Sequence, residues 1–323
     1  NTRSRGLGDV YKRQSSDTHV VAASLDESNF WSKVGLLDGD PENRGSVPLK
    51  EENVERLDEY MRAFNQPVSR VSLEQGEYAN TGFTQWGASG LAAAWAEENT
   101  RESIFNAFRR KETFATTGTR IAVRFFGGYN LSSIDLNSES LVSEAYEKGV
   151  TMGSDLLHNE NKIPEFLVWA QRDKNGAPLQ RIQIIKGWID NNSGRPKEKV
   201  FDVACSDGMQ PDPITNRCPD NGARVNINDC SISTNVGSSE LKTVWKDPEF
   251  APDDKTFYYV RVLENPTCRW STWDAIKAGY KPREGLHETI QERAWSSPIW
   301  YIPEQSDVEV VPLGGTIQLR NID

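Results

Sequence analysis

The clearest hydrophobic pattern in the first part of the chain lies in the segment 49–64, "LKEENVERLDEYMRAF". Its apolar residues recur at helical spacing among charged positions, which predicts an amphipathic helix with one buried face. These residues are Val54, Leu57, Tyr60, Met61 and Phe64. Pro67 ends the predicted helix. The segment 71–90 that follows is rich in Gly, Ser, Thr and Asn, so we expect a long ordered loop there.

A second predicted helix, over 100–111, leads into a strand. Asn99 or Thr100 is placed to cap this helix. Its expected buried face consists of Ile104, Phe105, Ala107 and Phe108. After "ATTG" the apolar period changes to two, which predicts a strand whose successive side chains point to opposite faces. One face has Ile121, Val123 and Phe125, and the other has Ala122, Arg124 and Phe126.

From about residue 112 onward the pattern favours strands. The runs "PEFLVWAQRD" and "LQRIQIIKGWID" flank the turn "KNGAP", which predicts a β-hairpin. Further strands are expected at "EKVFDVAC", "KTFYYVRVLE" and "AWSSPIWYI", and a short helix at "SESLVSEAYEKG". Five or more strands without a long helix between them favour a β-sandwich over a parallel sheet.

The net charge of the chain indicates which kinds of binding partner to expect. The 323 residues carry a formal net charge of -10 with 37% hydrophobic residues, so a folded core is expected. No basic excess exists to neutralise phosphates, which argues against nucleic acid or an anionic membrane as a general partner. No apolar run approaches the roughly 20 residues of a membrane span. The first fourteen residues, "NTRSRGLGDVYKRQ", run against this acidic trend. They resemble a translated sequencing adapter, so we interpret 1–14 as a non-native segment; a short native arm is the alternative.

The four cysteines are Cys205, Cys218, Cys230 and Cys268, and the first three lie in a stretch rich in Pro, Asp, Asn and Gly. An even count in loop-like sequence predicts two disulfides and an oxidising compartment, hence a periplasmic or secreted protein. A zinc site is a weaker alternative because C-x₂-C spacing and a nearby histidine are lacking. Free thiols are a third alternative, and the spacing does not decide which cysteines pair.

The sharpest candidate for chemistry is the Asp17-x-His19 pair in "SSDTH". Residues on alternate positions at a strand end point to the same side, so both side chains can reach one divalent ion. On spacing alone, a surface aspartate beside a solvated histidine is the more common explanation. His158 and His287 have acidic neighbours but fit polar loop or helix-end positions. The sequence contains no Walker motif, no G-x-G-x-x-G and no nucleophile elbow.

The segment "ENPTCRWSTWDAI" brings two tryptophans next to a cysteine. Arg269, Trp270 and Trp273 allow an aromatic binding patch. Packing as core beside Cys268 is the alternative that we favour, because tryptophan often packs beside a disulfide bond.

Several of these segments together resemble a known family. They are "SSDTH", "SNFWSKVGLLDG", "WGASGLAAAWAEENTRESIFNAFRRKETFATTGTRIAVRFFGGYN", "RIQIIKGW", "KVFDVACSDG", "FYYVRVLENPTCRWSTWDAI" and "IQERAWSSPIWY". In this order they resemble the C-terminal half of the bacterial domain of unknown function 3604 family, over almost all of 15–303. That family is similar to the polymerase-and-histidinol-phosphatase (PHP) superfamily of metal-dependent hydrolases. Ser16, Asp17 and His19 match the superfamily's last metal-binding motif, although Ser15 stands where a glycine is expected.

The resemblance implies an α/β fold in two parts: the truncated end of a PHP-like distorted β/α barrel over 15–111, and a mostly antiparallel, sandwich-like β domain over 112–323. It implies that the parent protein hydrolyses a small-molecule ester or phosphoester with Mn, Zn or Fe ions, and that Asp17 and His19 are two of the metal ligands. The superfamily's earlier histidine motifs are missing, so we expect this chain to be inactive by itself. The alternative function is a secreted, non-enzymatic binding or structural module carried by the β domain.

Overall fold

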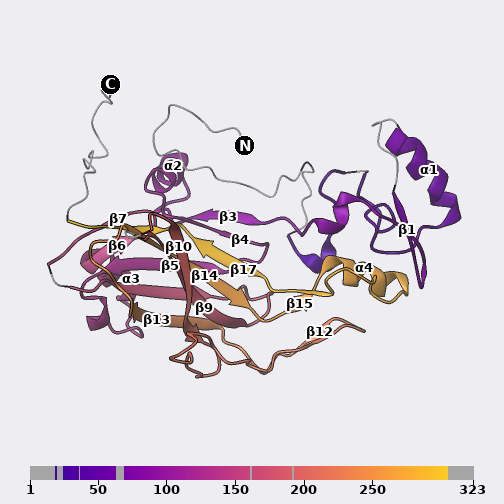
Figure 1. Ribbon diagram of the computed structural model, residues 1–323. Helices are drawn as coiled ribbons and strands as arrows, with labels where there is room; N and C mark the ends of the chain where they lie inside the picture. The colour runs from indigo at the N-terminus through magenta and orange to yellow at the C-terminus, as the bar shows by residue number, and fades with distance from the viewer. Residues whose placement is uncertain are drawn as a thin grey trace.

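The computed structural model describes residue 19 and residues 25–35, 37–62, 69–160, 162–190 and 193–304, without the side chains of Arg56 and Tyr60. This part of the chain is a mixed α/β structure with most strands in antiparallel sheets and few helices. In Figure 1 the two large sheets occupy one side of the molecule, and α1 and β1 lie on the other side near α4. The described residues do not show the PHP-like barrel expected for 15–111.

The larger sheet has eight strands. Six of them follow the order β10 (Pro196–Cys205), β9 (Leu179–Ile189), β14 (Thr256–Glu264), β17 (Arg293–Ser296), β4 (Thr113–Thr116) and β3 (Leu91–Ala94). Off this path, β18 (Ile299–Ile302) pairs antiparallel with β14 and parallel with β7 (Asp155–Leu157). The predicted barrel segment 15–111 contributes β3, which pairs antiparallel with β4 from the predicted β domain.

The second large sheet has four antiparallel strands, in the order β13 (Glu240–Lys246), β8 (Glu165–Gln171), β5 (Ala122–Gly128) and β6 (Gly149–Thr151). Three two-stranded sheets complete the strands of the described residues: β1 (Arg70–Leu73) with β2 (Gly76–Ala79), β11 (Val225–Asn226) with β12 (Ser231–Ile232), and β15 (Thr267–Cys268) with β16 (Thr289–Ile290).

The helices are short. The α-helices are α1 (Glu51–Arg62), α2 (Arg101–Arg109), α3 (Leu141–Lys148) and α4 (Trp270–Ala278). The 3₁₀ turns are η1 (Glu27–Asn29), η2 (Gly82–Gln85) and η3 (Leu131–Ser133). Thr100 caps α2 by accepting a hydrogen bond from the amide of Ser103 at 3.2 Å, which agrees with the sequence prediction. No helix in the described ranges has the length and apolar character needed to cross a bilayer.

The main core lies between the two large sheets, as in a β-sandwich. It joins Phe125 and Phe166 of the four-stranded sheet to Ile184, Tyr258 and other buried residues of the eight-stranded sheet. Phe126, next to Phe125 in β5, faces the opposite side and packs with α3 and η3. This alternation explains why both phenylalanines are buried: each face of β5 is covered.

The hairpin predicted at "KNGAP" is wrong. The strands on either side of this turn, β8 and β9, belong to different sheets and do not pair. β8 instead pairs with β5 and β13, whereas β9 pairs with β10 and β14. The turn therefore connects the two layers of the sandwich, and most residues of both strands are buried in this arrangement.

Two further expectations need correction. The predicted loop 71–90 contains the hairpin β1–β2 and the turn η2. The predicted buried face of α2 is largely exposed, with Phe105 at 58% and Phe108 at 46%, and Ala107 is the residue that is buried. A helical period gives the direction of an apolar stripe but not whether another element covers it.

Buried charges hold the N-terminal segment against α4. The Arg44 guanidinium donates to both carboxylate oxygens of Asp274 at 2.7 Å, and both side chains are almost fully buried. Arg269 donates to the carbonyls of Thr84 and Trp86 at 2.7 and 2.6 Å. These contacts join residues more than 180 positions apart, so they depend on the tertiary fold.

Candidate functional site

The strongest candidate site is a cavity at the end of β14, where two buried glutamates lie on neighbouring, hydrogen-bonded segments of the backbone. Glu264 is the last residue of β14, and its amide donates a 3.0 Å hydrogen bond to the carbonyl of Glu292, just before β17. Both side chains line a cavity of about 550 Å³, with Glu264 0% and Glu292 4% exposed. We call it the acidic cavity.

Acidic residues dominate the lining. The carboxylates are those of Asp26, Glu27, Asp173, Glu264 and Glu292, and Arg120 is the cationic lining residue. Trp273 and the disulfide-bonded Cys230 and Cys268 form part of the remaining lining. When these carboxyls are ionised, this charge balance favours positively charged groups in the cavity.

The Glu264 carboxyl is buried without a hydrogen-bond partner of normal geometry among the described residues. Burial, and then the neighbouring Glu292 carboxylate, raise the pKa of Glu264 to about 8. The Thr119 hydroxyl and the Ala177 amide offset only part of this rise. Gly176 leaves room for the carboxyl, because a Cβ atom there would lie 2.8 Å from Oε1 of Glu264.

Glu292 has one close partner. The Thr117 hydroxyl donates a short hydrogen bond to Oε2 of Glu292, and the Arg293 amide donates to the same hydroxyl at 2.9 Å. Burial raises the pKa of Glu292 to about 7, although the hydrogen bond from Thr117 lowers it in part. Near neutral pH, the two glutamates therefore hold at least one proton between them.

The other three carboxylates are fixed by backbone amides. Glu27 accepts from the amides of Ala88 and Trp270 at 2.8 and 2.6 Å, and burial raises its pKa. Asp26 accepts from the Ser28 amide at 2.8 Å. Asp173 accepts from the Arg120 amide at 2.8 Å. Each of these carboxylates accepts at least one backbone hydrogen bond, whereas neither oxygen of the Glu264 carboxyl has a hydrogen bond of normal geometry to a described residue.

The metal ligands predicted from sequence fall only partly within the structure. Asp17 lies outside the described residues. His19 is exposed, and its amide donates to the Lys33 carbonyl at 2.7 Å. In the described part of the chain, no group of three or more His, Cys, Asp or Glu side chains is placed to hold a metal ion. The described residues therefore do not provide the ligand set of a multi-metal hydrolase.

The other residues considered from sequence lie elsewhere. The His158 Nδ1 atom is 2.8 Å from the Tyr301 hydroxyl, and His287 lines a separate cleft. Trp270 is fully buried and stacks on Phe30, which agrees with the core prediction, whereas Trp273 lines the acidic cavity. The four cysteines form the disulfides Cys205–Cys218 and Cys230–Cys268, as predicted in number.

Sequence reasoning missed both glutamates of the acidic cavity. One signal was available for Glu264. Buried residues alternate along β14 at Thr256, Tyr258, Val260 and Val262, and Glu264 occupies the next inward position. A carboxylate that continues a buried period is unusual and marks a candidate site. Buried residues also alternate at Glu292, Ala294 and Ser296, but Ala294 and Ser296 are small, so the sequence pattern there is weaker.

The fold and the two disulfides define a strand-rich α/β protein of sandwich type, compatible with an extracellular or periplasmic location. Residues 13–303 match the family described as "Protein of unknown function (DUF3604)", and the chain belongs to this family. No curated protein and no solved structure gives a significant match.

Proposed function

We propose that the strand-rich part of the chain is a binding module whose acidic cavity takes a small ligand carrying an ammonium or guanidinium group. The observation that supports this most directly is Glu264, a fully buried carboxyl without a hydrogen bond of normal geometry to any described residue. Burying such a group is costly unless a ligand supplies donors. A cationic donor removes both the unmet hydrogen bonds and the repulsion between Glu264 and Glu292.

An organic cation fits the cavity better than a metal ion. No three carboxylates are placed together as metal ligands in the described ranges. The volume of about 550 Å³ exceeds what a single ion needs, and the ring of Trp273 provides an apolar surface for the carbon part of a ligand. Because the carboxyls must ionise to attract a cation, affinity increases as pH rises through 7 to 8.

Calorimetric titration with putrescine tests this proposal. We expect saturable binding at pH 8.5, weaker binding at pH 6, and proton release that makes the heat depend on the buffer. The titration is therefore repeated in two different buffers, neither of which carries an ammonium group that would compete with putrescine. Glu264→Gln should weaken binding about tenfold, while Glu147→Gln, an exposed glutamate on α3, should leave it unchanged.

The result that overturns the proposal is equally specific. It fails if millimolar putrescine gives no saturable heat at pH 8.5, or if Glu264→Gln and Glu292→Gln both bind as tightly as the unmodified chain. A parallel titration with Mn²⁺ separates an organic cation from a metal ion.

A second proposal concerns hydrolysis of an ester or phosphoester, with Asp17 and His19 as ligands of divalent Mn, Zn or Fe. What supports it is the resemblance of Ser16, Asp17 and His19 to the last metal-binding motif of the PHP superfamily. The family match includes these residues, but the family is described as of unknown function and names no activity. Metal analysis of the purified chain, alongside Asp17→Ala and the control His287→Ala, tests the ligand role. Equal metal content in all three proteins would contradict it. No catalytic step is assigned to the described residues.

A further inference from the structure

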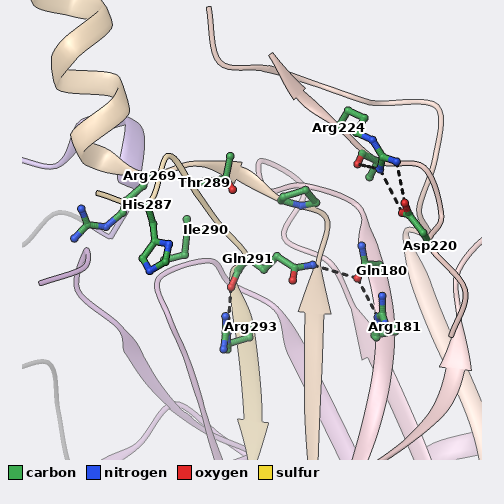
Figure 2. A pocket seen from close by; sticks show the side chains of 12 residues that line it. Gln180, Arg181, Asp220, Arg224, Arg269, His287, Thr289, Ile290, Gln291 and Arg293 are labelled. Atoms are coloured by element: carbon green, nitrogen blue, oxygen red, sulfur yellow. Dashed lines mark hydrogen bonds and ion pairs between the residues drawn. The ribbon is translucent and has the colours of Figure 1, made fainter. Parts of the chain in front are cut away.

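A second cavity lies on the other side of the segment 291–293, and its charge is opposite. Side chains alternate along this segment, so that Glu292 lines the acidic cavity while Gln291 and Arg293 line a cleft of about 640 Å³. We call this the basic cleft. Its other polar and charged lining residues are Gln180, Arg181, Asp220, Arg224, Arg269, His287 and Thr289 (Figure 2).

Two of the four arginines are already occupied. Arg224 donates to both carboxylate oxygens of Asp220, at 2.8 and 3.3 Å, at the edge of the cleft. Figure 2 shows the Arg269 side chain directed away from the cleft. Its guanidinium donates to the carbonyls of Thr84 and Trp86. These residues add no uncompensated charge that a ligand in the cleft would meet.

Arg293 has no carboxylate within ion-pair distance among the described residues. Its Nε donates to the Gln291 carbonyl at 3.1 Å, and its guanidinium lies 6.0 Å from the ring centre of the Trp295 indole. The side chain is half-buried. Its terminal amino groups are therefore available to a ligand, in the planar arrangement that suits an oxyanion.

Arg181 carries the second surplus charge. It donates to Asp202 at 2.9 Å, but the same buried carboxylate also accepts from Arg217 at 3.4 Å. One aspartate thus faces two arginines, and one positive charge remains. Between Arg181 and Arg293, the side-chain amide of Gln291 donates to Oε1 of Gln180 at 3.1 Å (Figure 2). The same oxygen accepts from Nε of Arg181 at 2.9 Å, so Gln180 links Arg181 to Gln291.

We propose that the basic cleft is a binding site for a small oxyanion, a carboxylate or a phosphate group, held by Arg181 and Arg293. The two guanidinium groups supply charge-assisted donors, and the hydrogen-bonded side-chain amides of Gln180 and Gln291 lie between them. The site is distinct from the acidic cavity, because residues 291–293 separate the two. It uses none of the side chains of the proposed cation site, although burial raises the pKa of Glu292 and the Arg293 charge offsets part of that rise. The two proposals are tested with different ligands, so each can fail without the other.

Calorimetric titration of the full chain with inorganic phosphate, succinate and chloride at constant ionic strength tests the site. We expect phosphate or succinate to bind saturably and chloride not to bind; the preferred anion identifies the source of the oxyanion. Arg293→Gln should weaken binding about tenfold. Arg195→Gln is the matched control, because Arg195 is an exposed arginine on the connection at the other end of β9.

The variant Arg181→Gln is a second probe, but it also releases a partner of Asp202 and can affect folding. Its thermal unfolding temperature is therefore measured beside its affinity, and the variant Arg293→Gln decides the outcome if Arg181→Gln is unfolded. The proposal is overturned if neither phosphate nor succinate binds at millimolar concentration. It is also overturned if a folded Arg293→Gln binds as tightly as the control.

Discussion

The backbone amide of Glu264 donates to the carbonyl of Glu292, and the side chains of both residues enter the same acidic cavity. The two strands therefore bring two carboxyls together by backbone geometry, without a salt bridge to either among the described residues. Their mutual repulsion persists in the folded state because the backbone pairing fixes their positions. This arrangement makes the stability of the fold sensitive to pH.

The first prediction concerns that pH dependence. The pKa values of Glu264 and Glu292 in the folded chain are about 8 and about 7, above the ordinary value of 4.5. Between pH 4.5 and pH 8, the folded state therefore binds more protons than the unfolded state. As a result, the contribution of the two glutamates to the free energy of unfolding decreases as pH rises through this range. Glu264→Gln should be more stable than the unmodified chain by about 2 kcal/mol at pH 8.5.

Urea unfolding at pH 5 and pH 8.5 measures this difference. The gain should shrink at pH 5, where Glu264 is protonated in the folded chain. Glu147→Gln, on the exposed side of α3, provides the control and should show no such dependence. A Glu264→Gln variant that is destabilised at pH 8.5 would contradict the pKa assignment.

The second prediction concerns the disulfides. Cys205–Cys218 closes a sequence separation of 13 residues and Cys230–Cys268 one of 38. Loop-closure entropy gives losses of about 3 and about 4 kcal/mol when each pair is replaced by serine. Intact mass under non-reducing conditions should first show a loss of four hydrogens relative to the reduced chain. Urea unfolding of the two double variants then ranks the bonds, and equal stability of all three proteins would refute the expectation.

The third prediction concerns the buried ion pair between Arg44 and Asp274. Asp274→Asn leaves the buried guanidinium without its counter-charge, so we expect a loss of about 3–5 kcal/mol in the free energy of unfolding. Arg224→Gln breaks an exposed pair with Asp220 and should change the free energy by less than about 1 kcal/mol. Similar effects for both variants would mean that the Arg44 pair is not isolated from solvent.

The fourth prediction compares two phenylalanines. Phe125 is fully buried between the sheets, whereas Phe105 on α2 is 58% exposed. Phe125→Ala should lower the free energy of unfolding by about 3–5 kcal/mol because it leaves a cavity in the core. Phe105→Ala should stay within about 0.5 kcal/mol. A large decrease in the free energy of unfolding for Phe105→Ala would instead mean that this face of α2 is buried, as its periodicity predicted.

Local chemistry was the part of the fold that could be predicted from sequence. Residues 49–64 contain helix α1, Thr100 caps α2, and the alternation at Ile121, Val123 and Phe125 marks β5. These features depend on side chains a few positions apart, and a local pattern records such spacing. Strand pairing does not, and the turn after β8 therefore joins two sheets instead of closing a hairpin.

The Asp17-x-His19 pair can be recognised in the sequence because its spacing is local, whereas the acidic cavity combines residues that are far apart in the chain. Glu27, Asp173, Glu264 and Glu292 come from separate parts of the chain and meet only after the sheets have formed. Each is an ordinary glutamate or aspartate in sequence, because burial and mutual repulsion raise a pKa only in the folded protein.

By itself, the sequence determined the strand-rich class and the family to which the chain belongs, and it predicted the number of disulfide bonds but not which cysteines pair. Each of these depends on composition or on the order of motifs along the chain. The tertiary structure alone decided which strands pair, which face of α2 is covered, and that Glu264 and Arg293 line cavities of opposite charge. The physical reason is that burial and electrostatic environment are properties of neighbours in space, and most of these neighbours are distant in the chain.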